Sequence, residues 1–178
     1  MANMGGFSVA GMKKLQKQLN KIQQGNVEAF IDACAKELAA RLLAKVIKHT
    51  PVRQYPANSG KKGGTLRRGW TSKTHKEAEN GSGTPNAAMA AAYAESLQIN
   101  HIGKMLQIEI INPVEYASYV EYGHRQEPGR YVPELGKRLK KGWVQGQFML
   151  TVSEQEIQDI APKVLTSKIK KFLEECMK

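Results

Sequence analysis

Apolar residues recur with a helical period through the first fifty positions of the chain. A first amphipathic helix carries them three or four positions apart, at Met12, Leu15, Leu19 and Ile22. Asn26 can cap a second, longer helix that runs to about Lys48. Its apolar stripe comprises Val27, Phe30, Ile31, Cys34, Leu38, Leu42 and Val46. The pattern therefore predicts two consecutive helices.

The helical pattern ends at Pro51, because a proline disfavours the helical conformation at the residue before it. Glycines, prolines and basic residues then predict an exposed, mobile loop from Pro51 to Gly64. We interpret Thr65 to His75 as a strand with a local irregularity at Gly69. The next segment, residues 76–94, begins polar and becomes alanine-rich, which is compatible with a short helix or with a surface excursion.

A period of two follows the alanine-rich segment. Ser96 to His101 and Met105 to Ile111 both alternate apolar and polar positions, and the residues between them can turn the chain back as a hairpin. Together with the strand expected at residues 65–75, this hairpin predicts a small antiparallel sheet of three to four strands. The fold class expected is therefore α+β.

The sequence NPVEYASYVEYGHR, residues 112–125, predicts a short capped helix behind the hairpin. Asn112 can cap it, Pro113 suits its first position, and Gly123 can end it in a left-handed conformation. Its aromatic residues occupy more than one side of the helix. Such a helix is either part of a core or part of a subunit interface, where tyrosine is enriched.

A second long loop is expected at residues 125–147, because a connection of this length is usually functional or disordered. After it, Ser153 and Glu156 form an S-x-x-E capping box that predicts the start of a C-terminal helical segment. An interior proline costs about 3 kcal/mol, so we expect a break near Ala161 with Pro162 opening a further helix.

The composition of the 178 residues indicates one globular domain, 1–178, with 41% hydrophobic residues. Within it we distinguish an N-terminal helix (1–25), a core (26–152) and a C-terminal helical segment (153–178). No run approaches the roughly 20 apolar residues of a membrane span, and the start lacks the pattern of a secretory signal. We therefore expect synthesis in the cytoplasm, no membrane partner and two free cysteines.

The formal net charge of +11 indicates the kind of partner, since it would attract nucleic acid or an acidic protein surface. The candidate contact residues for DNA or for a ring neighbour lie in the two predicted loops and beside them. They are Arg53, Lys61, Lys62, Arg67, Arg68, Arg125, Arg130, Lys137, Arg138, Lys140 and Lys141. Such groups neutralise phosphates without identifying bases. They also serve to solubilise loops, and both interpretations remain open.

The residues that could form a catalytic or metal-binding site are scattered along the chain. The four histidines fall in different segments, and no complete phosphate-binding, dinucleotide-binding or nucleophile-elbow motif occurs. Glu115 and Glu121 lie six positions apart, on different faces of the predicted helix, so we interpret them as solvated carboxylates. We expect no cofactor, no metal and no enzymatic activity.

Several segments, in this order, resemble the neck or head–tail joining proteins of tailed bacteriophages, a family that includes minor capsid and tail-completion proteins. They are TPV after the long helix, TLRRGW, INPVEYASYVEYGHR and GQFML before the terminal helix. The resemblance runs from about residue 26 to the end, and EYASYVEYGHR is its most specific part. The ending FMLTVSEQEIQDIAPKVLTSKIKKFL is similar to those of contractile-tail phages and defective prophages.

The resemblance implies a non-enzymatic virion subunit that forms a ring at the head–tail joint, expected to be a hexamer, and leaves a channel for DNA. Its partners would be copies of itself, the portal, adaptor or head-closure ring, and the tail tube or terminator proteins. Candidate residues for subunit or core packing are Trp70, Tyr116, Tyr119, Val120, Tyr122 and Gly123. We expect Tyr116, Tyr119, Val120 and Tyr122 to pack against the sheet and the long helix. The alternative is a small basic protein that binds nucleic acid without sequence preference.

Overall fold

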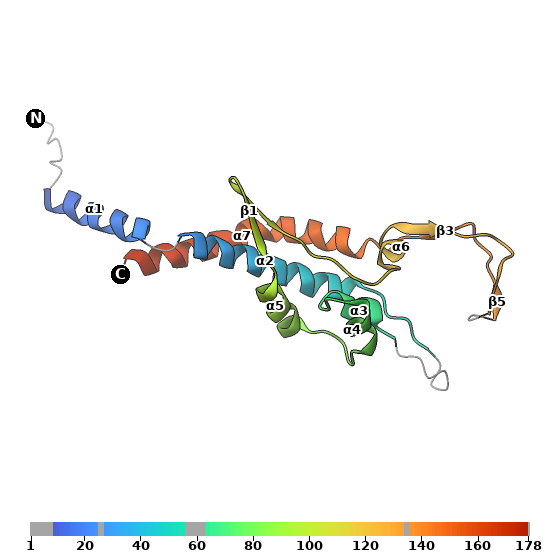
Figure 1. The fold of residues 1–178 in the computed structure, drawn as a ribbon. Helices are drawn as coiled ribbons and strands as arrows, with labels where there is room; N and C mark the ends of the chain where they lie inside the picture. Colours follow the sequence, from blue (N-terminus) through green and yellow to red (C-terminus); the bar gives the residue numbers. More distant parts are fainter. Residues whose placement is uncertain (1–8, 25–26, 56–62, 134–135, 178) are drawn as a thin grey trace, which may run out of the picture.

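Two long helices, α2 and α7, lie side by side and form the long axis of the molecule (Figure 1). The computed structural model describes residues 9–24, 27–55, 63–133 and 136–177. The helices are α1 (Val9–Gln24), α2 (Val27–His49), α3 (Thr65–Gly69), α4 (His75–Asn80), α5 (Ala87–Ser96), α6 (Ala117–Tyr122) and α7 (Met149–Met177). The strands are β1 (Ile99–Ile102), β2 (Met105–Ile108), β3 (Gly123–Arg125), β4 (Tyr131–Val132), β5 (Lys137–Arg138) and β6 (Trp143–Gln145).

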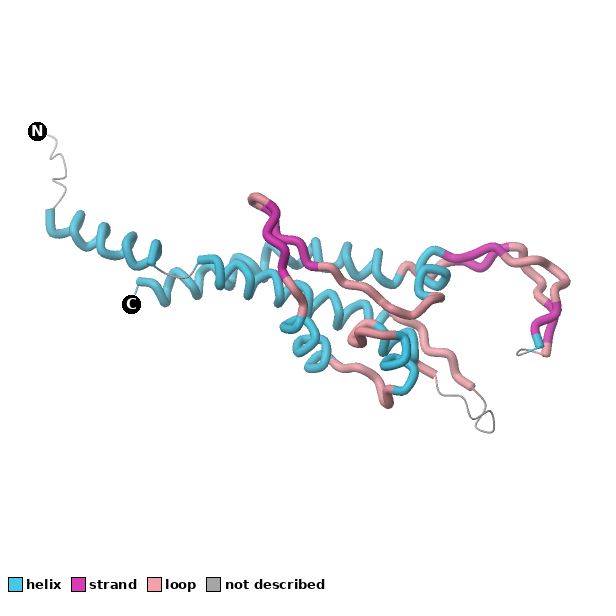
Figure 2. The backbone as a smooth tube through the Cα atoms, viewed as in Figure 1, coloured by secondary structure: helices cyan, strands magenta, loops and turns pink. Residues whose placement is uncertain are grey.

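The strands form two-stranded antiparallel ribbons, and no larger sheet occurs among the described residues (Figure 2). β1 pairs with β2, β3 with β6, and β4 with β5. The predicted α+β class and the predicted hairpin are confirmed, with Ile102 opposite Met105 at its turn. The prediction of one sheet of three to four strands is wrong, because its third strand does not exist.

Residues 65–69 form a helix and residues 70–74 form turns, where a strand was expected over residues 65–75. Leu66 and Trp70 stand four positions apart and are both buried, a spacing that fits one face of a strand as well as one side of a helix; the chain forms the helix α3, with Trp70 directly after it. Thr74 then caps α4, accepting a hydrogen bond from the Glu77 amide while the Glu77 carboxylate accepts from the Thr74 amide. Two short helices therefore replace the predicted strand.

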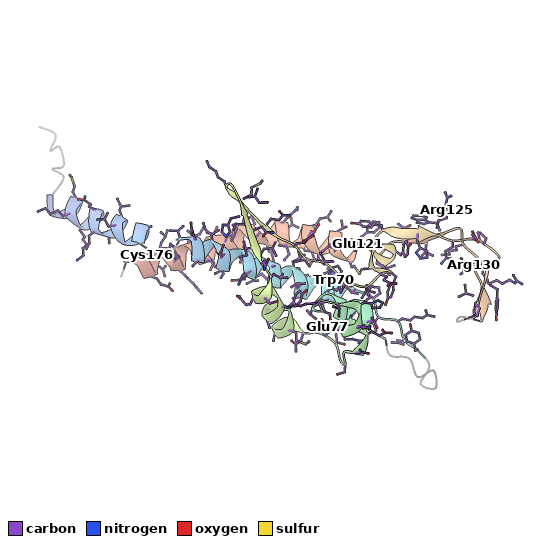
Figure 3. The ribbon with its side chains drawn as sticks, in the orientation of Figure 1. Trp70, Glu77, Glu121, Arg125, Arg130 and Cys176 are labelled. Carbon is purple, nitrogen blue, oxygen red and sulfur yellow. The ribbon has the colours of Figure 1, made fainter. Side chains whose placement is uncertain are left out.

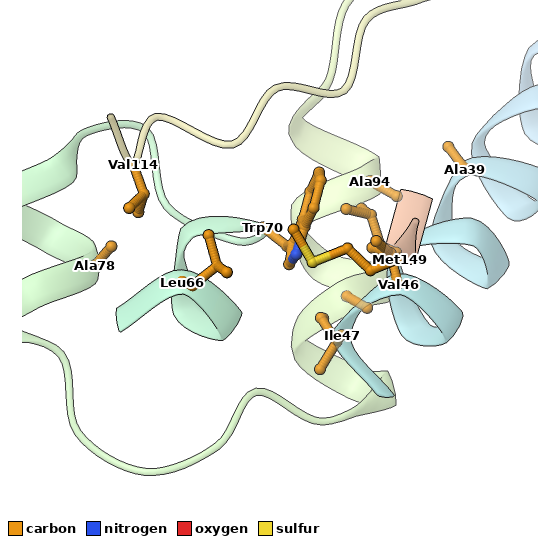
Figure 4. Close-up of a cluster of buried hydrophobic side chains, with 11 residues drawn as sticks. Ala39, Val46, Ile47, Leu66, Trp70, Ala78, Ala94, Val114 and Met149 are labelled. Atoms are coloured by element: carbon orange, nitrogen blue, oxygen red, sulfur yellow. The ribbon is translucent and has the colours of Figure 1, made fainter. Parts of the chain in front are cut away.

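The hydrophobic core lies where α2 meets α3, α5 and the start of α7 (Figure 4). Leu43 and Val46 of α2 are fully buried, and the small side chains of Ala90 and Ala94 let α5 approach α2 closely. The indole of Trp70 is buried in this cluster and donates to the Thr50 hydroxyl at 2.8 Å. This bond satisfies the one polar atom that the indole carries into the core.

Three helix boundaries differ from their predictions. α6 begins at Ala117 instead of Pro113, because the Asn112 amide donates to the Leu66 carbonyl and its oxygen accepts from the Val114 amide. α7 begins at Met149, so Ser153 lies inside it and donates to the Met149 carbonyl instead of capping. Pro162 also lies inside α7, and the expected break near Ala161 is absent from the described helix.

The predicted N-terminal helices are confirmed as α1 and α2. Asn26, the expected cap of α2, lies outside the described residues. The described parts of the predicted loop at 51–64 contain no strand and no helix, which agrees with the prediction of irregular structure there. Within the described residues, no helix is both long enough and apolar enough to span a membrane.

Candidate functional site

The segment from Gly123 to Gln147 projects from one end of the body as an arm, where the sequence predicted a long loop at residues 125–147 (Figures 1 and 2). β3 and β6 pair at its root, with Gly123 opposite Gln145 and Arg125 opposite Trp143. β4 and β5 pair nearer its end, with Tyr131 opposite Arg138. We call residues 123–147 the arm.

Two glycines and one carboxylate fix the root of the arm. A Cβ on Gly123 would lie 2.4 Å from the Val144 carbonyl oxygen, and one on Gly146 would lie 2.3 Å from the Glu121 carbonyl oxygen. Gly123 also has a φ of 86°, which side-chain-bearing residues rarely adopt. Gly123 does end α6 as predicted, although with an extended ψ of 173° rather than a left-handed one. The strands at the root thus approach each other closely only because both positions are glycine.

Glu121 connects this root to the start of α7 (Figure 3). Its buried carboxylate accepts from the Leu150 amide at 2.9 Å, the Thr151 amide at 3.0 Å and the Thr151 hydroxyl at 2.8 Å. The carboxylate satisfies amides of the first turn of α7 and opposes the positive end of the helix dipole. The interpretation of Glu121 as a solvated carboxylate is therefore wrong, because its partners lie about thirty positions later in the chain.

The side chains of the arm are basic and aromatic, and they are exposed. Tyr131 and Trp143 are 53% and 52% exposed. The predicted contact residues of the second loop all lie exposed on the arm: Arg125, Arg130, Lys137, Arg138, Lys140 and Lys141. Arg138 also donates to the Gly129 carbonyl at 2.7 Å and lies 6.0 Å from the centre of the Tyr131 ring. The structure therefore brings six cations and two aromatic anchors onto one projecting ribbon.

The tyrosines of α6 are exposed beside the root of the arm. Tyr116, Tyr119 and Tyr122 are 42%, 59% and 62% exposed, while Val120 packs against the core. The expectation that these tyrosines pack inside their own chain is wrong, because Ala117 and Val120 form the inward face of α6. Contact with another subunit stays a prediction for them.

A cleft of about 480 Å³ lies beside α6. Its apolar lining includes Val52, Leu66 and Val120, and the rings of Tyr55 and Tyr116 form part of its wall. Partial burial, with a smaller contribution from Tyr55, raises the pKa of Tyr116 above its ordinary value. Arg53 lies at the same cleft, with its guanidinium 5.0 Å from the centre of the Tyr55 ring.

The other predicted basic residues do not form one surface. Arg67 donates through Nε and Nη2 to the Thr50 carbonyl, at 3.0 and 2.5 Å. Arg68 is buried and donates to the Ala78 and Gly63 carbonyls, so the prediction that it contacts DNA or a ring neighbour is wrong. These arginines hold α3, α4 and the end of α2 together. Lys61 and Lys62 lie outside the described residues.

One polar cluster resembles a nucleophile and its base, and no local sequence motif predicts it because its residues are about a hundred positions apart. His49 of α2 places Nδ1 at 3.0 Å from the Ser153 hydroxyl and Nε2 at 3.5 Å from the Glu156 carboxylate of α7. Lys45 donates to the same carboxylate, and this hydrogen bond lowers the pKa of Glu156. Because Ser153 is fully buried, no substrate reaches its hydroxyl. The cluster therefore fastens α2 to α7.

Among residues 9–24, 27–55, 63–133 and 136–177, no group of three or more histidine, cysteine and acidic side chains is close enough to hold an ion. Cys34 is a buried free thiol whose pKa is raised by burial, and Cys176 is also free.

The elongated helical body and the exposed basic arm define a protein built for contact with other macromolecules. Residues 13–123 match the family described as "Bacteriophage HK97-gp10, putative tail-component". The chain therefore belongs to the HK97 gp10-like family and is a structural tail component of a tailed-phage virion, which implies contact with other virion proteins. Searches among curated proteins and among solved structures returned no match.

The family match ends at Gly123, the first residue of the arm. The resemblance inferred from the sequence is thereby confirmed at the level of a tailed-phage tail family. The part of the chain after residue 123, comprising the arm and α7, lies beyond the matched residues.

Proposed function

We propose that copies of this protein assemble head to tail into a closed ring at the head–tail joint, leaving a channel through which DNA passes. The observation that carries the proposal is the arm, which presents six basic residues with Tyr131 and Trp143 to the surroundings of the molecule. A two-stranded ribbon is marginally stable in water by itself, so an arm of this length favours a partner surface. Exposed Tyr, Trp and Arg side chains are the types that contribute most to protein interfaces.

A ring also requires that each copy offer two different surfaces, because heterologous contacts join unlike patches. The exposed tyrosines of α6 and the neighbouring cleft supply a second surface, distinct from the arm in position and in charge. We propose that one of these surfaces contacts a neighbouring copy and that the other contacts an adjoining ring. Sixfold symmetry is the simplest arrangement, and twelve copies would satisfy the same contacts.

The test is the joining of purified heads to purified tails by the added protein, with electron microscopy of the protein alone. Replacing Lys137, Arg138, Lys140 and Lys141 by glutamine should impair joining and leave the circular dichroism spectrum unchanged. A control with the same loss of charge replaces Lys48, Lys73, Lys76 and Lys104, which lie exposed on the body and on the β1–β2 turn. Unimpaired joining by the arm variant would refute a role for the arm.

The alternative, a free nucleic-acid-binding protein, is favoured by the same arm, since Tyr131 and Trp143 could stack on bases. Such a protein would retard DNA as a small species, with affinity falling steeply as salt rises. The ring proposal instead expects particles of uniform size in the absence of DNA. Size-exclusion chromatography with and without DNA separates the two.

A further inference from the structure

The N-terminal helix α1 carries an uncovered apolar seam. Met12 and Leu19 are 55% and 52% exposed, although they belong to the row in which apolar residues recur every three or four positions. This spacing makes a narrow seam of the kind that packs against another helix, rather than the broad apolar face of a helix that lies in a membrane surface. Figure 1 shows α1 extending away from the body, past the end of α7.

A helix of sixteen residues is about 24 Å long and is marginally stable in water when nothing covers its apolar side. α1 contacts α7, yet that contact leaves Met12 and Leu19 in solvent. The seam therefore lacks a matching surface within its own chain at these two positions. The remaining surface of α1 is basic: its sequence contains four lysines and no acidic residue.

The nearby end of the body has the complementary character. We call it the tip, meaning residues 27–35 of α2 and 172–176 of α7. Phe30 and Phe172 stack there with ring centres 4.4 Å apart, and Val27 and Ile31 are 41% and 42% exposed one turn apart. The charged residues of the tip are all acidic: Glu28, Asp32, Glu174 and Glu175.

Lysines adjoin the tip on both helices: Lys36 follows the tip segment of α2, and the exposed Lys170 and Lys171 precede Phe172 on α7. Lys36 pairs with Glu95, and Lys168 pairs with Glu37. Asp32 faces His101 of β1 at 3.2 Å. Glu28 stands beside Val27, and Glu174 and Glu175 follow Phe172, whose ring stacks on Phe30; we call these three residues the acidic rim.

We propose that α1 of one copy docks on the tip of a second copy, with its apolar seam on Val27 and Ile31 and its lysines against the acidic rim. Pairing of two α1 helices is disfavoured, because it would bring two purely basic helices together. The contact joins unlike surfaces, so it propagates from copy to copy and closes in a ring. It rests on the self-assembly in the proposed function and adds a specific interface to it.

Charge reversal with mixing tests the interface. Variant A carries K13E, K14E and K17E on α1, and variant B carries E28K, E174K and E175K on the tip. Each variant alone has like charges on both surfaces, so its dissociation constant for self-association should rise at least about tenfold. An equimolar mixture restores opposite charges at every contact and should recover wild-type association. Analytical ultracentrifugation at fixed ionic strength measures all three, and circular dichroism verifies that each variant is folded.

Each outcome decides the inference. Recovery in the mixture supports it and excludes docking of the α1 seam on the tip of its own chain, because an internal contact cannot be exchanged between copies. Wild-type association of A or B alone would overturn the inference and leave the ring proposal standing, as would a mixture that stays dissociated. A wild-type protein that is monomeric at every concentration would overturn both. The wild type could instead sediment with anionic lipid vesicles and show no self-association, while variant A fails to sediment with them. This outcome would assign α1 to membrane binding and would also overturn the inference.

Discussion

Single residues join segments that are distant in the sequence. Thr50, at the end of α2, is fully buried; its hydroxyl donates to the Val46 carbonyl at 2.6 Å and accepts from the Trp70 indole. Its carbonyl oxygen accepts from Arg67. Glu121 plays the same part at the other junction, between α6 and α7. Each of the two residues accepts hydrogen bonds from donor groups that belong to another segment of the chain.

Removing the carboxylate of Glu121 should destabilise the fold, because two backbone amides at the start of α7 lose their acceptor. We expect Glu121→Ala to lower the free energy of unfolding by about 1–3 kcal/mol, measured by urea denaturation. Glu121→Gln should cost less, since its amide oxygen still accepts one bond. The control is Glu115→Ala, which removes an exposed carboxylate from the same segment and should change stability by less than about 0.5 kcal/mol. Equal effects of the two alanine variants would contradict the capping role.

The Thr50 hydroxyl is tested by Thr50→Val, which keeps the shape and removes the acceptor of the Trp70 indole. Leaving the buried N–H unsatisfied should cost about 1–3 kcal/mol in the same assay. Thr84→Val, at an exposed position, provides the comparison and should be close to neutral. If Thr50→Val unfolds at the wild-type urea midpoint, the hydrogen bond contributes nothing.

At the scale of elements, ion pairs fasten α7 to α2 along their length. Lys168 of α7 pairs with Glu37 of α2, and Lys45 of α2 pairs with Glu156 of α7. The hydrogen bond from Lys168, followed by that from Arg41, lowers the pKa of Glu37. The hydrogen bond from Lys45 lowers the pKa of Glu156 in the same way. Both carboxylates therefore prefer the charged form in the folded state.

These depressed pKa values make the fold sensitive to acid. A carboxylate whose folded pKa lies below its ordinary value of 4.5 stabilises the protein above that pH, and the contribution is lost as pH falls through the folded pKa. We expect the melting temperature to fall below about pH 4.5, and to fall less in the double variant Glu37→Gln, Glu156→Gln. The variant should be less stable than the wild type at pH 7 and approach it in acid. This account is refuted if the melting temperatures of the two proteins change in parallel with pH. It is also refuted if the exposed control Glu154→Gln alters the pH dependence of the melting temperature as much as the double variant does.

Pro162 is the other feature of α7 to test, because an interior proline removes a backbone donor and crowds the preceding turn. The substitution Pro162→Ala, at an exposed position of α7, should therefore stabilise the protein by up to about 3 kcal/mol. Lys163→Ala, at the adjacent exposed position, should change the urea midpoint little. A destabilised Pro162→Ala variant would indicate that the proline shapes α7 for a contact with a partner.

The elements that the sequence predicted correctly are those with a sustained local period. Apolar residues recur over about three turns of α1 and about five turns of α2, and the β1–β2 hairpin alternates on both sides of its turn. The prediction failed where long-range partners decide the structure. The spacing of Leu66 and Trp70 fits a strand or a helix, and the hydrogen bond from the Trp70 indole to Thr50 could not be foreseen from it. Ser153 has the sequence of a helix cap, but the carboxylate of Glu121 accepts from the amides at the start of α7 instead. The arm pairs strands of two or three residues, which leave too short a pattern to detect.

At the scale of the whole molecule, α1 and the arm extend from opposite ends of a helical body (Figure 1). The core lies between them, at the junction of α2, α3, α5 and α7. Each projecting element is fastened at one end only, so its loss should leave the core intact. The basic residues of the arm were predicted from the sequence as contact residues, whereas their arrangement on a ribbon depends on the pairing of β3 with β6.

Removing the arm tests this separation. Arg125 and Trp143 face each other as the last pair of β3 and β6, so replacing residues 126–142 by Asn-Gly closes the ribbon with a two-residue turn. We expect the free energy of unfolding to change by less than about 1 kcal/mol, because the replaced residues lie outside the core cluster. The shortened protein should fail to join heads and tails. A shortened protein that unfolds would show that the arm supports the body.

The root of the arm has a further consequence. Gly123, Gly146 and Glu121 fix how the ribbon leaves the body, and they do so without any side chain from beyond Arg125 or before Trp143. The arm can therefore vary independently of the body. A related chain that keeps these three residues at the root could carry an arm of another length or charge. If the arm is the contact surface proposed above, exchanging arms between such chains would change the partner and leave the helical body the same.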